Sequence, residues 1–225
     1  MKAKTLLNLV AGEYICPIAY KDEYEYLMSD GNQDFVDGWL SAINMKLARL
    51  GEGGAFFMAP RQLAPSDANK IRDDFARYRD VYGPANRMLQ IIRAGKDEFT
   101  LGVGEYIQLA ELNQAVNESA TLEAQLRSLQ NVIRDGSARF KNRELLKKLL
   151  EHLQKDGYLI VVNENTEMYR TTGKVTQLTN VLTFLAENTD IVGSGLEAED
   201  EGKDSGLLFD GDQGGEADAG ASDGQ

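Results

Sequence analysis

Apolar residues recur every three to four positions from residue 142 to residue 155, in the stretch "NRELLKKLLEHLQKDG". This spacing predicts a helix with one apolar face. The face contains Leu146, Leu149, Leu150 and Leu153. Asp156-Gly157 ends the helix, and "YLIVVN" and "EMYRTT" then predict two short strands paired across "ENT". A helix followed by a small two-stranded ribbon is typical of the end of a winged-helix domain.

Four more segments upstream carry a helical pattern. They are "DANKIRDDFARYRDVYG" with Ser66 as its N-cap, "PANRMLQIIRAG", "EYIQLAELNQAVNE" and "TLEAQLRSLQNVIRDG". Between the second and the third, "EFTLGV" is a candidate for a short strand. We therefore expect one domain over residues 61–190, in which several helices lead into the ribbon.

Residues 1–60 repeat this order of elements in a smaller form. "TLLNLVAGEYICPIAY" predicts a helix and a short strand, and "KDEYEYLMSD" and "QDFVDGWLSAIN" predict two helices. In the last of these, four residues are expected to face inward: Val36, Trp39, Leu40 and Ile43. "MKLARL" and "AFFMAP" flank a glycine-rich turn and predict a hairpin. The sequence thus predicts a mainly α fold with small β wings (α+β), built as two tandem winged-helix domains.

Residues 191–225 differ in composition from the rest of the chain. The formal net charge of the chain is −12, and residues 193–225 contribute −9 of it, with nine glycines. Few large apolar side chains are available to offset the entropy of ordering, so we predict a disordered acidic tail. Within it, Leu207-Leu208-Phe209 is either a chance cluster or a short docking motif.

The helix predicted over "GKVTQLTNVLTFLAENTD" contains no charged residue from Val175 to Ala186. Its apolar stripe consists of Val175, Leu178, Leu182 and Leu185. Val181 and Phe184 widen the stripe beyond what packing against one neighbour requires. We expect Val181 and Phe184 to contact another chain, either a second copy or a partner subunit. The alternative is that the N-terminal domain or the linker of the same chain covers them.

Few residues in this sequence suit catalysis, a metal ion or a cofactor. The only histidine, His152, and the only cysteine, Cys16, lie in stretches that predict structural roles. "GVGEYI" lacks the last glycine of a dinucleotide fingerprint, and the chain contains no P-loop. We therefore expect no enzymatic activity, no cofactor and no metal. With no apolar run near the ~20 residues of a membrane span, we expect a cytoplasmic protein without membrane contact.

The strongest nucleic-acid signal is the basic segment "RFKNRELLKKLLEHLQK". The candidate contacts to DNA phosphates are Arg139, Lys141, Arg143, Lys147 and Lys148. Glu144 and Glu151 interrupt the segment, so it is either a weak, non-specific DNA contact or a solvated helix face.

Several stretches resemble the MukE/MksE family, the kleisin-interacting tandem winged-helix subunits of bacterial SMC condensins. They are "GEYICPIAYKDEYEYLMSDGNQDFVDGWL", "GEGGAFFMAPR", "LLEHLQKDGYLIVV" and "EMYRTTGKVTQL". The resemblance implies a homodimer that binds a kleisin (MksF-like) and, through it, an SMC ATPase (MksB-like) acting on chromosomal or plasmid DNA. It also implies a nucleoid-associated protein without enzymatic activity, and it supplies no residue-level binding motif.

Two other classes of protein remain as alternatives. A winged-helix transcriptional regulator would have a dominant basic recognition face. An enzyme such as a nuclease subunit would need a cluster of carboxylates or histidines, which the sequence does not show.

Overall fold

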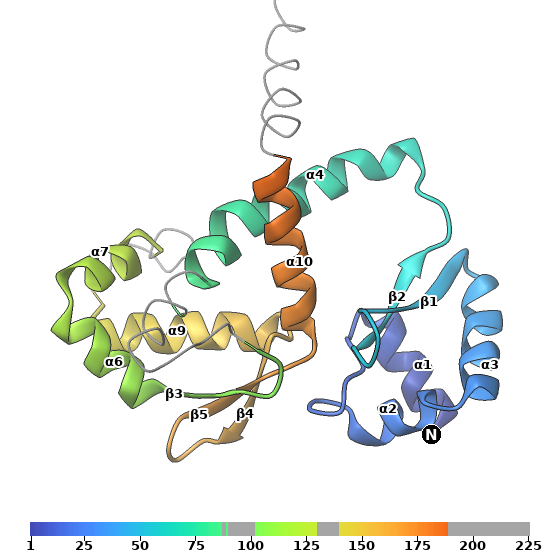
Figure 1. The fold of residues 1–225 in the computed structure, drawn as a ribbon, viewed down its shortest axis with the longest axis horizontal. Helices are drawn as coiled ribbons and strands as arrows, with labels where there is room; N and C mark the ends of the chain where they lie inside the picture. The colour runs from blue at the N-terminus through green and yellow to red at the C-terminus, as the bar shows by residue number, and fades with distance from the viewer. Residues whose placement is uncertain (87–88, 90–101, 130–139, 189–225) are drawn as a thin grey trace, which may run out of the picture. The chain divides into compact units, whose positions relative to one another are not determined.

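The computed structural model describes residues 1–86, 89, 102–129 and 140–188. These residues are mainly helical, with two small antiparallel sheets, and this confirms the α+β class (Figure 1). The predicted acidic tail and Arg139 lie outside the described residues. In the described part of the chain, helices are too short or too polar to cross a membrane. Met1–Ala186 forms one compact unit with two hydrophobic cores.

The N-terminal core is formed by three helices and a hairpin. The elements are α1 (Lys2–Val10), α2 (Lys21–Leu27), α3 (Asp30–Ser41), β1 (Met45–Arg49) and β2 (Phe56–Pro60). The strands pair antiparallel, which confirms the predicted hairpin, and their register places Leu47 opposite Met58. Ile15, between α1 and α2, forms an isolated bridge with Phe56 and is fully buried. The hairpin therefore carries one further short backbone pairing at its second strand.

The inward face of α3 is narrower than the sequence indicates. Val36 and Leu40 are buried, but Trp39 is 44% exposed and Ile43 is 48% exposed, so these two predictions are wrong. At ~100° per residue, Trp39 lies on the flank of the Val36–Leu40 line. α3 ends at Ser41, and Ile43 belongs to the turn before β1 rather than to the helical face.

The C-terminal core is larger and begins with a linker. Its elements are η1 (Pro65–Asp67), α4 (Ala68–Arg77), the π-helical turn η2 (Tyr78–Tyr82), β3 (Tyr106–Gln108), α6 (Leu109–Glu118), α7 (Ala120–Ser128), α9 (Asn142–Lys155), β4 (Leu159–Asn163), β5 (Met168–Thr171) and α10 (Lys174–Glu187). The helix α9 and the β4–β5 hairpin agree with the sequence prediction. The leucine face of α9 is buried, and Leu145 joins it.

The start of α4 differs from its prediction. Ser66 lies inside the turn η1 and caps no helix, so its assignment as the N-cap is wrong. The Asp67 carboxylate instead accepts a hydrogen bond of 2.9 Å from the backbone N–H of Ala64. Pro65 places the chain in a tight turn before the helix proper begins.

A third strand, β3, extends the C-terminal hairpin into a sheet with the order β3-β5-β4. Ile107 pairs with Tyr169 and is buried. The sequence predicts helix at Glu105–Gln108, and this is wrong because Gly104, at φ +88°, turns the chain into the strand. The strand predicted at "EFTLGV" lies mostly outside the described residues, and Gly102 and Val103 are not in a strand.

The loop between β5 and α10 lies against the N-terminal core. The backbone N–H of Gly173 donates a hydrogen bond of 3.3 Å to the Cys16 sulfur, which is buried. A Cβ atom at position 173 would lie 2.8 Å from the Cys16 Cβ and 2.9 Å from the Ala55 Cβ. Such an approach leaves no room for a side chain, so only glycine fits here without displacing its neighbours.

Candidate functional site

The basic side chains of α9 project opposite its leucine face. Leu145, Leu146, Leu149, Leu150 and Leu153 are all buried, while Arg143, Lys147 and Lys155 are exposed. Lys141 precedes the helix, and its backbone N–H donates a hydrogen bond of 2.8 Å to the Glu144 carboxylate. The Glu144 carboxylate, in the first turn, thus satisfies a backbone N–H group at the helix N-terminus. It also offsets positive charge in the first part of the basic segment.

Two of the candidate phosphate contacts meet a carboxylate of the hairpin. Arg143 forms an ion pair with Glu167, and the Lys147 Nζ lies 3.6 Å from the other oxygen of the same carboxylate. Glu167 adopts φ +48°, a left-handed conformation that costs a non-glycine residue about 1–2 kcal/mol. The two ion pairs and the partial burial of its side chain, which is 20% exposed, favour this strained position.

Lys148 makes a different contact from Arg143 and Lys147. The Lys148 Nζ lies 4.5 Å from the centre of the Phe140 ring, a cation–π distance. The structure therefore brings Arg143 and Lys147 together at Glu167 and places Lys148 at an aromatic ring. Glu167 could not be recognised from the sequence as part of this site, because it lies 24 residues after Arg143.

The helix α10, which has no charged residue from Val175 to Ala186, packs on the C-terminal core through one side. Val175 and Leu178 are each 2% exposed, and Leu182 packs against the same core. Phe184 is 47% exposed, and its ring stacks on Phe75 of α4 with centroids 5.7 Å apart. Val181 lines a pocket together with Phe75. Helix α4, the first helix of the C-terminal part, thus covers part of the wide apolar face, and about half of Phe184 stays accessible.

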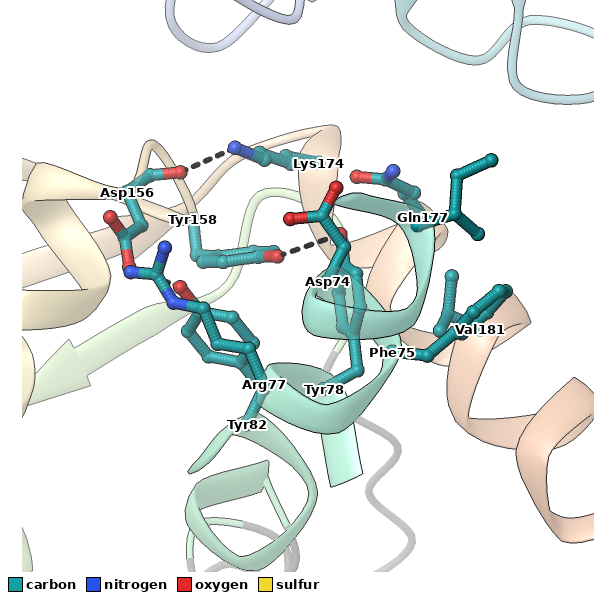
Figure 2. Close-up of a pocket in the computed structure, with 11 residues that line it drawn as sticks. Asp74, Phe75, Arg77, Tyr78, Tyr82, Asp156, Tyr158, Lys174, Gln177 and Val181 are labelled. Atoms are coloured by element: carbon teal, nitrogen blue, oxygen red, sulfur yellow. Dashed lines mark hydrogen bonds and ion pairs between the residues drawn. The ribbon is translucent and has the colours of Figure 1, made fainter. Parts of the chain in front are cut away.

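A pocket of about 340 Å³ opens between α4, η2, the end of α9 and the start of α10 (Figure 2). It is lined by Ile71, Asp74, Phe75, Arg77, Tyr78, Tyr82, Asp156, Tyr158, Lys174, Gln177 and Val181. Figure 2 shows Arg77, Asp156 and Lys174 at one end and Phe75 and Val181 at the other. The pocket is therefore polar at one end and apolar at the other.

The Asp156 carboxylate contacts several of the polar groups at the polar end of the pocket. It accepts hydrogen bonds from Arg77, at 2.8 Å, and from the Tyr82 hydroxyl. The His152 Nε2 lies 3.4 Å from the same carboxylate, and its ring stacks on Tyr82. His152 therefore has a structural contact here, and Asp156 and Arg77 largely neutralise each other.

Lys174 borders the pocket in an unusual environment for a lysine. Its ammonium donates a hydrogen bond of 2.7 Å to the backbone oxygen of Asp156. It lies 5.2 Å from the ring centre of Tyr14 and 5.0 Å from that of Tyr158. Burial lowers the pKa of Lys174 below its usual value, and burial raises the pKa of Tyr158. The site combines a partly desolvated cation with aromatic walls.

Within the described ranges, no group of three or more histidine, cysteine, aspartate or glutamate side chains is placed to hold a metal ion. Cys16, the second residue considered for chemistry, is buried.

A comparison with protein-family models gives no match for this chain, and a comparison with curated proteins gives no significant match.

Proposed function

We propose that this chain is the accessory subunit of a bacterial condensin of the MksB–MksF–MksE type. In this role it has no enzymatic activity, binds the kleisin and thereby regulates the SMC ATPase. The proposal starts from the resemblance of four sequence stretches to MukE/MksE. The observation that carries it further is the recurrence of one arrangement around both cores.

In each core, a short segment pairs with the second strand of a hairpin that directly follows a helix. In the N-terminal core, Ile15 pairs with Phe56, which lies in the hairpin that follows α3 in the chain. In the C-terminal core, β3 pairs with β5, which lies in the hairpin that follows α9 in the chain. Helices connected in this order to a strand and a hairpin are the arrangement of a winged helix. We infer two tandem winged helices, over residues 1–60 and 61–190, as in the MukE/MksE family.

The charges on the two helices favour a protein partner over sequence-specific DNA. α3 carries three aspartates and no lysine or arginine. On α9, Arg143 and Lys147 face the Glu167 carboxylate. A helix that reads the major groove needs cations available for phosphates and base edges. Contact with DNA is therefore proposed to be weak and non-specific, which disfavours the transcriptional regulator.

The proposed partner surface is the accessible edge of α10. Phe184 offers an aromatic ring that is already ordered by stacking on Phe75, with Val181 beside it on α10. Aromatic residues fixed in place lose little entropy on binding and often contribute most of an interface's energy. We assign this edge to the kleisin or to the second copy in a homodimer, in a cytoplasmic, nucleoid-associated complex.

The test is to purify the chain with an affinity tag, at its native expression level, from nuclease-treated cells. A kleisin and an SMC ATPase are expected in stoichiometric amounts. Co-expression with that kleisin should then give a complex that stays intact on size exclusion. Recovery without either partner, together with tight binding to one operator sequence, would instead establish the regulator.

A matched pair of variants locates the contact. Phe184→Asp should reduce kleisin capture or dissociate the dimer. Phe35→Asp changes an aromatic residue of similar exposure, 44% against 47%, on α3. It should leave both assemblies intact. Equal losses in the two variants would point to a general effect of the added charge.

A further inference from the structure

Twice in the pocket beside α4 and α10, a cation lies over a tyrosine ring and contacts an oxygen of Asp156. The Arg77 guanidinium lies 5.3 Å from the ring centre of Tyr82 and 2.8 Å from the Asp156 carboxylate. The Lys174 ammonium lies 5.0 Å from the ring centre of Tyr158 and donates a hydrogen bond to the Asp156 backbone oxygen. An aromatic ring next to an oxygen acceptor is therefore the way in which this pocket holds a positive charge.

Both of these cations are balanced by acids of the same chain. Arg77 forms its ion pair with Asp156. Burial lowers the pKa of Lys174, but the carboxylates of Asp156 and Glu13 act on its ammonium and oppose this change. The polar end of the pocket therefore has no cation left for the carboxylate of a ligand.

Asp74 and two aromatic residues that follow it in α4 and η2 form a similar arrangement without a cation. Asp74 is exposed and lines the pocket together with Phe75 and Tyr78 (Figure 2). Residues four apart on a helix are neighbours, and the Asp74 charge adds to the burial that raises the pKa of Tyr78. In the part of the chain that the structure describes, no lysine, arginine or histidine lies within ion-pair distance of the Asp74 carboxylate. A ligand could therefore supply the positive charge here.

The size and the apolar end of the pocket limit what else the ligand can contain. The volume of about 340 Å³ is at the lower end of the ~300–1,000 Å³ typical of small-molecule sites. Ile71, Phe75 and Val181 form the apolar wall. Phe75 directly follows Asp74 in α4, so the apolar wall begins next to the free carboxylate. A small compound with one charged end and one apolar end fits these dimensions.

We propose that this pocket binds a small organic ammonium compound that carries one apolar or aromatic group. Its charge pairs with Asp74 beside the Tyr78 ring, and its apolar group packs against Phe75 and Val181. A neutral ligand would leave Asp74 without an opposite charge, and an anionic ligand would be repelled by its carboxylate. This site goes beyond the proposed condensin role and does not depend on it.

The test is calorimetric titration of the full chain with 2-phenylethylamine and 3-methylbutylamine. At least one should bind saturably, and at least tenfold more tightly than the alcohol of the same shape, 2-phenylethanol or 3-methylbutanol. Methylamine controls for general attraction to the acidic residues 193–225, and it should bind at least tenfold more weakly because it lacks the apolar group. Absence of saturable binding by both amines would overturn the proposal. Equal binding of the alcohol or of methylamine would also overturn it.

A matched pair of variants places the ligand's charge. Asp74→Asn should weaken the amine at least tenfold and abolish its advantage over the alcohol. Asp73→Asn removes the same charge from an exposed neighbour that does not line the pocket, and it should leave binding unchanged. Both positions are exposed, so both variants should keep the circular dichroism of the unchanged chain. Unchanged binding by Asp74→Asn, or equal losses in the two variants, would refute the proposal.

Discussion

The helices α3 and α9 hold the same place in their halves of the chain, each directly before a hairpin, but they differ in charge. α3 has three aspartates and no lysine or arginine, and it exposes Phe35 and Trp39. α9 has four lysines and arginines against two glutamates, and it buries five leucines. One order of elements thus supports two helices with opposite outer surfaces.

Each helix is nevertheless joined to its hairpin by one acid. Asp37 of α3 accepts a hydrogen bond of 2.8 Å from the Leu47 N–H and one of 2.5 Å from Arg61, after β2. At α9 the polarity is reversed, since the helix supplies Arg143 and the hairpin supplies Glu167. The comparison teaches that a charge on such a helix can serve the attachment of the hairpin. Its sign alone is weak evidence for a nucleic-acid partner.

The largest effect is expected from the buried leucines of the two helices. Leu146→Ala in α9 and Leu40→Ala in α3 should each lower the free energy of unfolding by about 2–5 kcal/mol, because both residues are fully buried. They belong to separate cores, so the losses should add to within about 0.5 kcal/mol in denaturant unfolding. Trp39→Ala, at an exposed position of α3, is the control. If it cost as much as Leu40→Ala, the assigned inner face of α3 would be wrong.

The next effect concerns DNA. Glu167→Gln removes the carboxylate that pairs with Arg143 and Lys147. The affinity for non-specific DNA at low salt should therefore rise roughly tenfold, and this increase should disappear at high salt. Fluorescence anisotropy with two unrelated duplexes measures it. Asp34→Asn on α3 changes the net charge equally and should have a smaller effect.

A second variant on the basic face of α9 tests directly whether these residues contact DNA. Changing Arg143, Lys147 and Lys148 to alanine should weaken residual binding equally for both duplexes and reduce the salt slope by about 0.9 per lost phosphate contact. Loss of binding to only one duplex would favour the regulator.

A smaller effect on stability, with a clear effect on assembly, is expected at α10. Val181→Asp combined with Phe184→Asp removes an aromatic pair with Phe75, which is worth about 0.5–1.5 kcal/mol. Circular dichroism should stay near that of the unchanged chain, while size exclusion should show a monomer or loss of the kleisin. Unfolding of this variant would mean that both residues belong to the core. A folded variant that still dimerises and binds the kleisin would remove this edge from the interface.

The smallest effect concerns the acid that joins α3 to its hairpin. The backbone hydrogen bond from Leu47 lowers the pKa of Asp37, with a further contribution from Arg61. The stabilisation is therefore present above the unfolded pKa of ~3.9 and is lost as the pH falls through the lower folded value. Asp37→Asn should lower stability at pH 7 by at most about 1 kcal/mol. The difference from the unchanged chain should disappear near pH 2, and a difference that persists there would exclude titration of Asp37 as its cause.

The longer elements could be predicted from the sequence because their patterns repeat. In α9, leucine spacing continues over four turns, and β-branched residues then mark β4. The strand β3 could not be predicted, since three residues are too few for an alternating pattern. The apolar residues after it continue in helical spacing through Leu109 and Leu112. The local pattern favoured helix, and pairing with β5 decided the outcome.

The candidate sites were less accessible to sequence reasoning. The apolar width of α10 was visible, but its cover by Phe75 depends on how α4 packs. The contact of Glu167 with Arg143 depends on a left-handed turn that a glutamate seldom adopts. The pocket draws its lining from segments between residues 71 and 181. Such a site has no local signature, because only the packing of helices brings its charges together.

The contact of Gly173 with Cys16 has a practical consequence for kinetics. Cys16 is the only cysteine of the chain, and its sulfur is covered where the β5–α10 loop lies against the N-terminal core. A thiol reagent can modify it only after this junction separates, as in amide exchange through local opening. At high reagent concentration, the rate of modification equals the rate of separation. The rate at which Cys16 is modified thus measures how long the two cores stay in contact.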